Sequence, residues 1–179
     1  MINDKYLILV NWENPCRPVK RDVLIPVSGV LLESEAAENL KNLLISINAA
    51  EKITAVSGWR SVTEQRRIWD DSVKENGMDF TRKYVAAPRH SEHHTGLAVD
   101  LALKKDRIDF ICPDFPYEGI CQEFRQNAPM YGFVERYPEN KRHITKIFHE
   151  PWHFRYVGRK HALIMTAENL TLEEYLNAL

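Results

Sequence analysis

The clearest alternation of apolar and polar positions lies at Gly96–Leu103, in the sequence GLAVDLAL. An extended chain directs successive side chains to opposite faces, so its four large apolar side chains share one face: Leu97, Val99, Leu101 and Leu103. The other face carries Ala98, Asp100 and Ala102. The pattern predicts a strand whose large side chains face the core, with a lone carboxylate between two alanines on the opposite side.

Helical spacing and capping residues predict four helices. Ser34 is expected to cap the first one, whose face carries Ala37, Leu40, Leu44 and Ile47. Ser61 with Glu64 forms a capping box for the second, and Thr171 with Glu174 forms another for the last. The expected ranges are 34 to about 50, 61–77, 118–128, and from 171 onward.

Three further strands are expected, in Lys52–Gly58, Gly132–Tyr137 and Trp152–Val157. Helices come first and strands mixed with helices follow, which favours an α+β fold with a mainly antiparallel sheet. No repeat, low-complexity tract or Gly/Ser linker divides the chain. We therefore expect one domain over residues 1–179, with residues 1–24 as an N-terminal extension of unassigned role.

The charge and the cysteine content indicate which binding partners and which cellular compartment to expect. The 24 basic and 25 acidic residues give a net charge of −1 without a dense basic cluster, which argues against a nucleic acid partner. The apolar stretch Tyr6–Val10 is too short for a signal peptide or a membrane span. Three widely spaced cysteines, Cys16, Cys112 and Cys121, are interpreted as reduced thiols of a cytoplasmic protein. The alternative is a secreted protein with one disulfide and one spare thiol.

The segment SEHHTGLAVD, residues 91–100, offers part of a metal site. Zinc binds imidazole nitrogen and carboxylate oxygen, and a catalytic site uses three protein ligands. A straight strand would separate His93 from Asp100 by ~23 Å and place them on opposite faces. Both can therefore be ligands only if the chain bends, and Thr95-Gly96 is where a bend is expected. Otherwise Asp100 is a salt-bridged residue at a strand edge and His93 is solvated.

The tetrapeptide EPWH, Glu150–His153, offers the third ligand. Proline disfavours a helical predecessor, so the segment is extended, and a bulge or turn near Pro151 is needed to aim Glu150 and His153 at one point. Glu150 would then take a proton from zinc-bound water, while Trp152, Phe154 and Tyr156 pack on the core side. The alternative is an ordinary surface turn.

Two other histidines compete for the same role. His94 and His149 are adjacent to the proposed functional residues, and in an extended chain neighbouring side chains point in different directions. Only one of each adjacent pair is therefore expected to bind, and His94 is the more serious rival.

Two ordered motifs resemble a known family. The first is S-x-H-x-x-G-x-A-x-D, at Ser91, His93, Gly96, Ala98 and Asp100, and the second is E-x-W-H, at Glu150, Trp152 and His153. Together they resemble the zinc D-alanyl-D-alanine peptidases of the VanX, VanY and VanXY type. Segments 57–77, 131–141 and 150–158 look most like the VanXY branch, the bifunctional D,D-dipeptidase/D,D-carboxypeptidases of vancomycin-resistant bacteria. The resemblance covers most of residues 25–179.

The resemblance implies the zinc D-Ala-D-Ala peptidase fold, which is hedgehog-like, and a set of site residues. Zinc would be held by His93, Asp100 and His153, with Glu150 as general acid and base. Arg60 would stabilise the oxyanion, whereas without the resemblance it is read as a surface ion pair. Residues expected near the substrate are Ser91, Gln65 and Ser57. Ser57 and Trp59 stand where members with the sequence DGYR have Asp and Tyr, which leaves the substrate preference open.

The same resemblance implies the substrates. A cytoplasmic enzyme of this branch would meet free D-Ala-D-Ala and UDP-muramyl-pentapeptide, with no membrane, nucleic acid or obligate protein partner. The balance between dipeptidase and carboxypeptidase activity and the choice between D-Ala and D-Ser termini stay open. The alternative from another class is a catalytically silent module that keeps zinc for structure and binds muropeptides or a protein.

Overall fold

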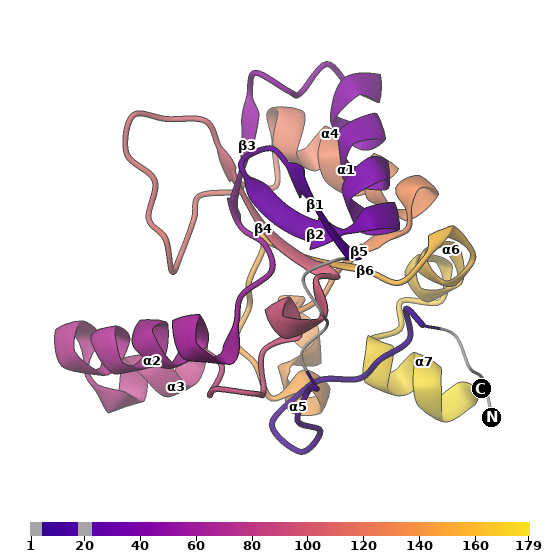
Figure 1. Cartoon of the computed structure of the whole chain (residues 1–179). Helices are drawn as coiled ribbons and strands as arrows, with labels where there is room; N and C mark the ends of the chain where they lie inside the picture. Colours follow the sequence, from indigo (N-terminus) through magenta and orange to yellow (C-terminus); the bar gives the residue numbers. More distant parts are fainter. Residues whose placement is uncertain (1–4, 18–22) are drawn as a thin grey trace.

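A computed structural model of the chain describes residues 5–17 and 23–179. Residues 1–4 and 18–22 of the expected N-terminal extension lie outside the described residues. At the centre is a four-stranded antiparallel sheet in the order β3-β4-β6-β5 (Figure 1). Its strands are β3 (Ile53–Ser57), β4 (Ala98–Leu103), β6 (His153–Tyr156) and β5 (Phe133–Glu135). The expected α+β class with an antiparallel sheet is confirmed.

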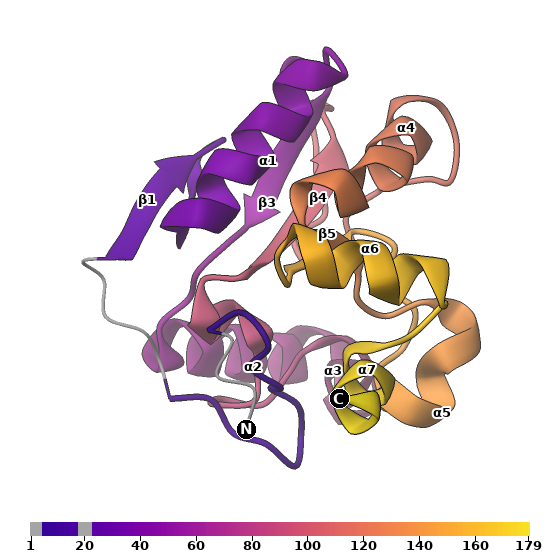
Figure 2. The same cartoon turned by 90° about the vertical axis from the view of Figure 1, so that its right-hand side faces the viewer.

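A hairpin of β1 (Leu24–Val27) and β2 (Val30–Glu33) precedes the first helix. Helices α1 and α4 lie together at one end of the molecule, and α2 and α3 lie together away from them (Figures 1 and 2). Among the described residues, none of the helices is both long and apolar enough to cross a membrane. The α-helices are α1 (Ser34–Ser46), α2 (Val62–Asn76), α3 (Met78–Tyr84), α4 (Gly119–Asn127), α5 (Arg142–Thr145), α6 (Arg159–Ala167) and α7 (Leu172–Ala178). Short 3-10 helices are η2 (Glu92–Thr95), η3 (Ala128–Tyr131) and η4 (Glu139–Lys141).

The core lies on one face of the sheet and sets the orientation of β4. Its apolar cluster joins leucines of α1 to the aromatic side chains of α4, β5 and β6. Leu97, Val99 and Leu101 belong to this cluster, as their alternation predicts. Asp100 lies between two of them in the sequence and therefore points to the opposite face of the sheet.

The predicted boundaries hold for some helices and fail for the first. The capping boxes at Ser61 and Thr171 are both present, and Gly77 follows the end of α2 as expected. The prediction for α1 is wrong at both ends. Glu33, not Ser34, caps this helix: its carboxylate accepts hydrogen bonds from the backbone N–H groups of residues 35 and 36. The helix ends at Ser46, well before residue 50, because Asn48 adopts a left-handed conformation (φ 53°).

Candidate metal centre and active site

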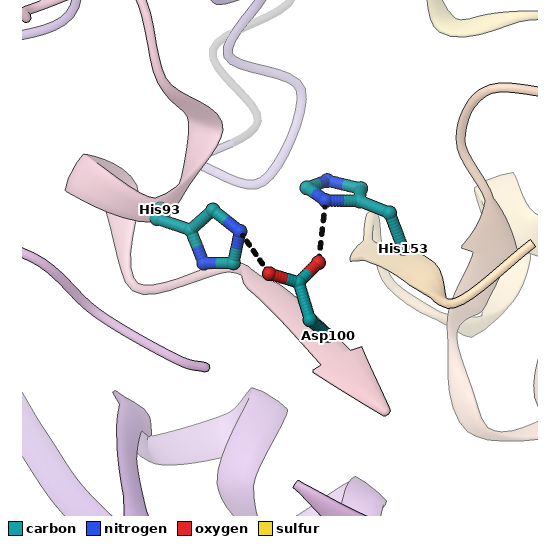
Figure 3. Close-up of side chains that lie close together, drawn as sticks. All are labelled: His93, Asp100 and His153. Atoms are coloured by element: carbon teal, nitrogen blue, oxygen red, sulfur yellow. Dashed lines mark hydrogen bonds and ion pairs between the residues drawn. The ribbon is translucent and has the colours of Figure 1, made fainter. Parts of the chain in front are cut away.

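Three buried side chains from separate elements meet on the far side of the sheet from the core (Figure 3). His93 lies on η2, and Asp100 and His153 lie opposite each other on the paired strands β4 and β6. Asp100 Oδ2 is 3.0 Å from His93 Nε2, and Asp100 Oδ1 is 2.9 Å from His153 Nδ1. One ligand atom from each residue lies within 4.8 Å of the others. The structure thus brings together the three predicted ligands.

The chain reaches this arrangement through a left-handed turn at Gly96 (φ 73°). A Cβ atom at this position would come within 2.8 Å of Leu24 Cδ2 and 3.1 Å of the backbone nitrogen of Glu33. Both the dihedral angle and the close packing therefore require glycine. The bend predicted at Thr95-Gly96 is confirmed, and it is what allows His93 to face the same point as Asp100.

The hydrogen bond on the outer side of His93 fixes which of its nitrogens faces the centre. Nδ1 is 2.7 Å from the carbonyl oxygen of Gly58, which can only accept. Nδ1 therefore carries the proton, and the lone pair of Nε2 points toward Asp100.

The competing histidines are engaged elsewhere. His94 Nδ1 lies 2.7 Å from the carbonyl oxygen of Arg60, and Nε2 accepts a hydrogen bond from the backbone N–H of Arg89. His149 Nε2 lies 2.7 Å from the Tyr117 hydroxyl. Neither belongs to the cluster of three ligand atoms found among the described residues.

A turn at Pro151-Trp152 places the buried Glu150 beside the three candidate ligands. The backbone N–H of His153 donates to the carbonyl oxygen of Glu150 across this turn, and Glu150 Oε2 lies 3.7 Å from His153 Nδ1. The turn predicted near Pro151 is confirmed. Three side chains of this segment were expected to pack on the core side, and they are buried in the apolar cluster: Trp152, Phe154 and Tyr156.

Arg60, three residues beyond β3, reaches into the same site. Its Nη2 lies 3.7 Å from Asp100 Oδ2, and its buried Nε has no hydrogen-bond partner among the described residues. The side chain is only 15% exposed, so it is not the surface ion pair of the alternative interpretation. The guanidinium thus contributes a positive charge to the wall of the cavity that holds the three predicted ligands.

These groups line one cavity together with two of the residues expected near a substrate, Gln65 and Ser91. Gln65 Nε2 donates to the carbonyl oxygen of Ala86, and Gln65 Oε1 has no hydrogen-bond partner among the described residues. Ser91 Oγ accepts from the backbone N–H of His93 and so caps η2. Ser57 lies opposite Asp100 across β3 and β4, and it is not among the described residues that line the cavity.

The ionisable side chains of the cavity have pKa values shifted by burial and by one another. Burial raises the pKa of Glu150 to about 8 and lowers that of His93 to about 4. Burial also acts to lower the pKa of His153, but hydrogen bonds to Asp100 and Glu92 outweigh it and raise the value to about 9. Asp100 has a pKa well below its usual range, because the two histidines outweigh the effect of burial. Two imidazoles and a charged carboxylate are a donor set that zinc accepts, so the residues present fit this ion.

Two residues around the centre were not expected from the sequence. Tyr137 lines the cavity and lies with its ring centroid 4.9 Å from that of His153. Glu92 is a fully buried carboxylate beside the same histidine. A charged residue directly before a ligand was the only local signal for Glu92, and the sequence did not show that it is buried.

Comparison with known proteins gives matches over nearly the whole chain. The family model of VanY, D-alanyl-D-alanine carboxypeptidase, matches residues 29–159. The bifunctional D-Ala-D-Ala dipeptidase and D-Ala-D-Ala carboxypeptidase VanXYC of Enterococcus gallinarum is 43% identical over 175 residues, covering 94% of this chain and 92% of that protein.

Two solved structures are also similar. The D,D-dipeptidase VanXYg, bound to a D-Ala-D-Ala phosphinate analogue, is 51% identical with a TM-score of 0.92, covering 98% of this chain and 72% of that one. A VanY D,D-pentapeptidase mutant in complex with Zn(II) is 33% identical with a TM-score of 0.78, covering 97% of this chain and 99% of that one.

Proposed function

Because the chain belongs to the VanY family of D-alanyl-D-alanine carboxypeptidases, we propose that it is a zinc-dependent D,D-peptidase. In this proposal it hydrolyses the dipeptide D-Ala-D-Ala and removes the C-terminal D-Ala from peptidoglycan pentapeptide precursors, and it thereby supports vancomycin resistance. The observation that carries the proposal is the convergence of His93, Asp100 and His153 in a cavity that also contains Glu150.

Zinc would be held by His93 Nε2, the Asp100 carboxylate and His153 Nδ1. When bound, it supplies a Lewis acid that polarises a peptide carbonyl and makes a water molecule acidic. The binding of Zn(II) by the VanY relative supports this choice of metal.

Glu150 is proposed as the group that moves protons. Its carboxylate accepts a proton from the attacking water and delivers it to the leaving amine of D-Ala, so that one residue serves both steps. Two features support this role: the side chain lies beside His153 without being one of the three clustered ligands, and burial raises its pKa to about 8. A carboxyl group with a pKa close to neutral can both accept and release a proton.

Arg60 is proposed to stabilise the negative charge that develops on the carbonyl oxygen. A fixed guanidinium at this point acts more strongly on the transition state than on the neutral substrate. The position of the side chain in the cavity wall, next to Asp100, supports the role. Ser91 and Gln65 are proposed as substrate contacts because they line the cavity, and Ser57 stays a prediction.

A second cavity next to the first supports the proposal that the site accepts both a dipeptide and a longer peptide. The second cavity shares Arg82, Val85, Ala86, Tyr137 and Ile147 with the first, and extends to the indole rings of Trp12 and Trp69. This extension offers an apolar path for the part of a pentapeptide precursor beyond its two terminal residues.

The proposal includes a cytoplasmic location and a single catalytic unit over residues 1–179. Free D-Ala-D-Ala and UDP-muramyl-pentapeptide would both be available there, and the three free thiols at Cys16, Cys112 and Cys121 agree with a reducing compartment. The N-terminal segment supports the single unit, because the carbonyl oxygens of Tyr6 and Ile8 accept hydrogen bonds from the buried Arg155.

The test is the release of D-Ala from D-Ala-D-Ala and from UDP-muramyl-pentapeptide, assayed side by side with and without a zinc chelator. We expect release from both substrates, loss of release with the chelator, and recovery on addition of zinc. A folded, zinc-loaded protein that releases D-Ala from neither substrate would instead be a binding module.

A further inference from the structure

The buried carboxylate of Glu92, a residue that also lines the cavity, lies at the Nε2 edge of His153, whereas Nδ1 of the same ring faces Asp100. Glu92 Oε1 accepts a hydrogen bond from Arg136 Nε at 2.8 Å and lies 2.9 Å from Arg155 Nη1. All three side chains are at most 1% exposed. Both guanidinium groups can only donate hydrogen bonds, so they hold the Glu92 carboxylate as a charged acceptor inside the protein.

The other oxygen of this carboxylate faces His153. Glu92 Oε2 lies 3.5 Å from His153 Nε2, and both atoms are buried without any other hydrogen-bond partner among the described residues. Buried polar atoms are costly to leave unpaired, so each of these two is the natural partner of the other. A charged carboxylate can only accept, and Nε2 must therefore carry the proton.

This proton determines what His153 presents to the metal centre. A histidine binds a metal ion only in its neutral form, which has a single N–H. With that proton on Nε2, the lone pair is on Nδ1. Nδ1 is the nitrogen that faces Asp100 at 2.9 Å. In His93 the nitrogens are exchanged: the carbonyl oxygen of Gly58 holds the proton on Nδ1, and Nε2 faces Asp100.

We propose that Glu92 is a positioning residue, which fixes the tautomer and the ring orientation of His153 so that Nδ1 can bind the metal. The inference rests on the metal centre proposed above. It gives Glu92 no contact with substrate, and its effect passes through the imidazole.

Arg136 couples this arrangement to the C-terminal helix. Its Nη1 and Nη2 donate to the two oxygens of Glu173, on α7, at 2.8 and 2.7 Å. Glu92 and Glu173 thus balance Arg136 and Arg155 in one buried cluster, but Glu92 is the member of this cluster that faces His153. Glu173 consequently provides a matched control, since its loss removes a negative charge from the same cluster without touching the histidine.

The deciding variant is Glu92→Gln. The amide oxygen must stay with the two guanidinium groups, which only donate, so the amide NH₂ turns toward His153 Nε2. That nitrogen then becomes the acceptor, Nδ1 takes the proton, and the lone pair for the metal is lost. We expect the affinity for zinc to fall ~10–100-fold, as measured by competition with a chromophoric chelator. Glu173→Gln should lower the melting temperature and leave the zinc affinity unchanged.

A second measurement does not depend on how the variant folds. The ¹⁵N chemical shifts of His153 in the zinc-loaded native protein should show zinc on Nδ1 and the proton on Nε2. The reverse assignment, or unchanged zinc affinity in a folded Glu92→Gln protein, overturns the role of Glu92 and leaves the metal centre intact. A native protein that binds no zinc at all overturns both.

Discussion

The hydrogen bonds on the outer side of each imidazole decide which histidines can hold a metal ion. His93 and His153 each have one ring nitrogen directed at Asp100 and the other at an acceptor, Gly58 O or Glu92. His94, by contrast, uses both ring nitrogens for backbone groups. Adjacent histidines with the same chemistry thus have different partners, and of this pair only His93 has a ring nitrogen directed at Asp100.

Replacement of Glu150 by alanine should separate metal binding from catalysis. Because Glu150 is outside the ligand set, the variant is expected to keep its zinc, while the loss of the proton-transfer group lowers kcat by ~10²–10⁴-fold. Zinc content by elemental analysis and D-Ala release are measured on the same preparation. The exposed Glu139→Gln is the control, and near-normal turnover in Glu150→Ala refutes the assignment.

Arg60→Ala should lower kcat by ~10²–10³-fold, as for the loss of one donor to a developing oxyanion. Zinc affinity should be unchanged. Arg67→Ala is the control. Arg67 is exposed on α2 and does not line the cavity, so its replacement removes the same charge and should leave the activity at the native level. An Arg60→Ala variant that changes only KM would make Arg60 a binding residue instead.

Among the structural elements, the turn between η2 and β4 is the one on which the site depends most. Gly96→Ala forces a left-handed conformation on alanine, which costs roughly 1–2 kcal/mol, and places its Cβ against Leu24 and the backbone of residue 33. We expect a lower melting temperature and weaker zinc binding, because His93 is displaced.

Gly29→Ala is the matched control for this prediction. Gly29, in the two-residue turn between β1 and β2, also has a positive φ (+86°), but an added Cβ would meet nothing within 4 Å. Its loss of stability therefore reports the backbone strain alone and should be the smaller of the two. Equal losses in both variants would show that the packing around Gly96 is unimportant.

Elements with a local signal were predictable from the sequence, and elements without one were not. Strand β4 follows from strict alternation, and α2 and α7 from their capping boxes. Helix α6 was missed because its apolar residues are contiguous at 162–165, without helical spacing, and no side chain caps its start. The hairpin β1–β2 was missed because Pro26 lies inside its first strand and neither strand alternates.

The residues of the candidate site likewise fall into those that the sequence predicted and those that it did not. The three ligands and Glu150 belong to short motifs, and the bends that unite them were predictable at Gly96 and Pro151. Glu92 was not, because its burial depends on pairing with Arg136 and Arg155, which lie 44 and 63 positions later in the chain. A pairing over such a distance leaves no local pattern.

Across the protein as a whole, the cavity next to the metal centre is expected to set the substrate range. Trp69→Ala removes an aromatic wall from the second cavity but none from the first. A lost contact worth ~1.4 kcal/mol would lower kcat/KM for UDP-muramyl-pentapeptide about tenfold. Hydrolysis of D-Ala-D-Ala should not change, since we expect the dipeptide to occupy the first cavity, which Trp69 does not line. Trp69→Phe keeps an aromatic ring and serves as the control; equal losses on both substrates in Trp69→Ala would contradict the assignment.

The most direct test of the account is the position of the metal in a crystal of the zinc-loaded protein, located by anomalous scattering at the zinc absorption edge. We predict one strong peak at ~2.0–2.2 Å from His93 Nε2, an oxygen of Asp100 and His153 Nδ1. A peak at His94 or His149, or a fully loaded protein in which these three side chains point away from one another, would contradict it.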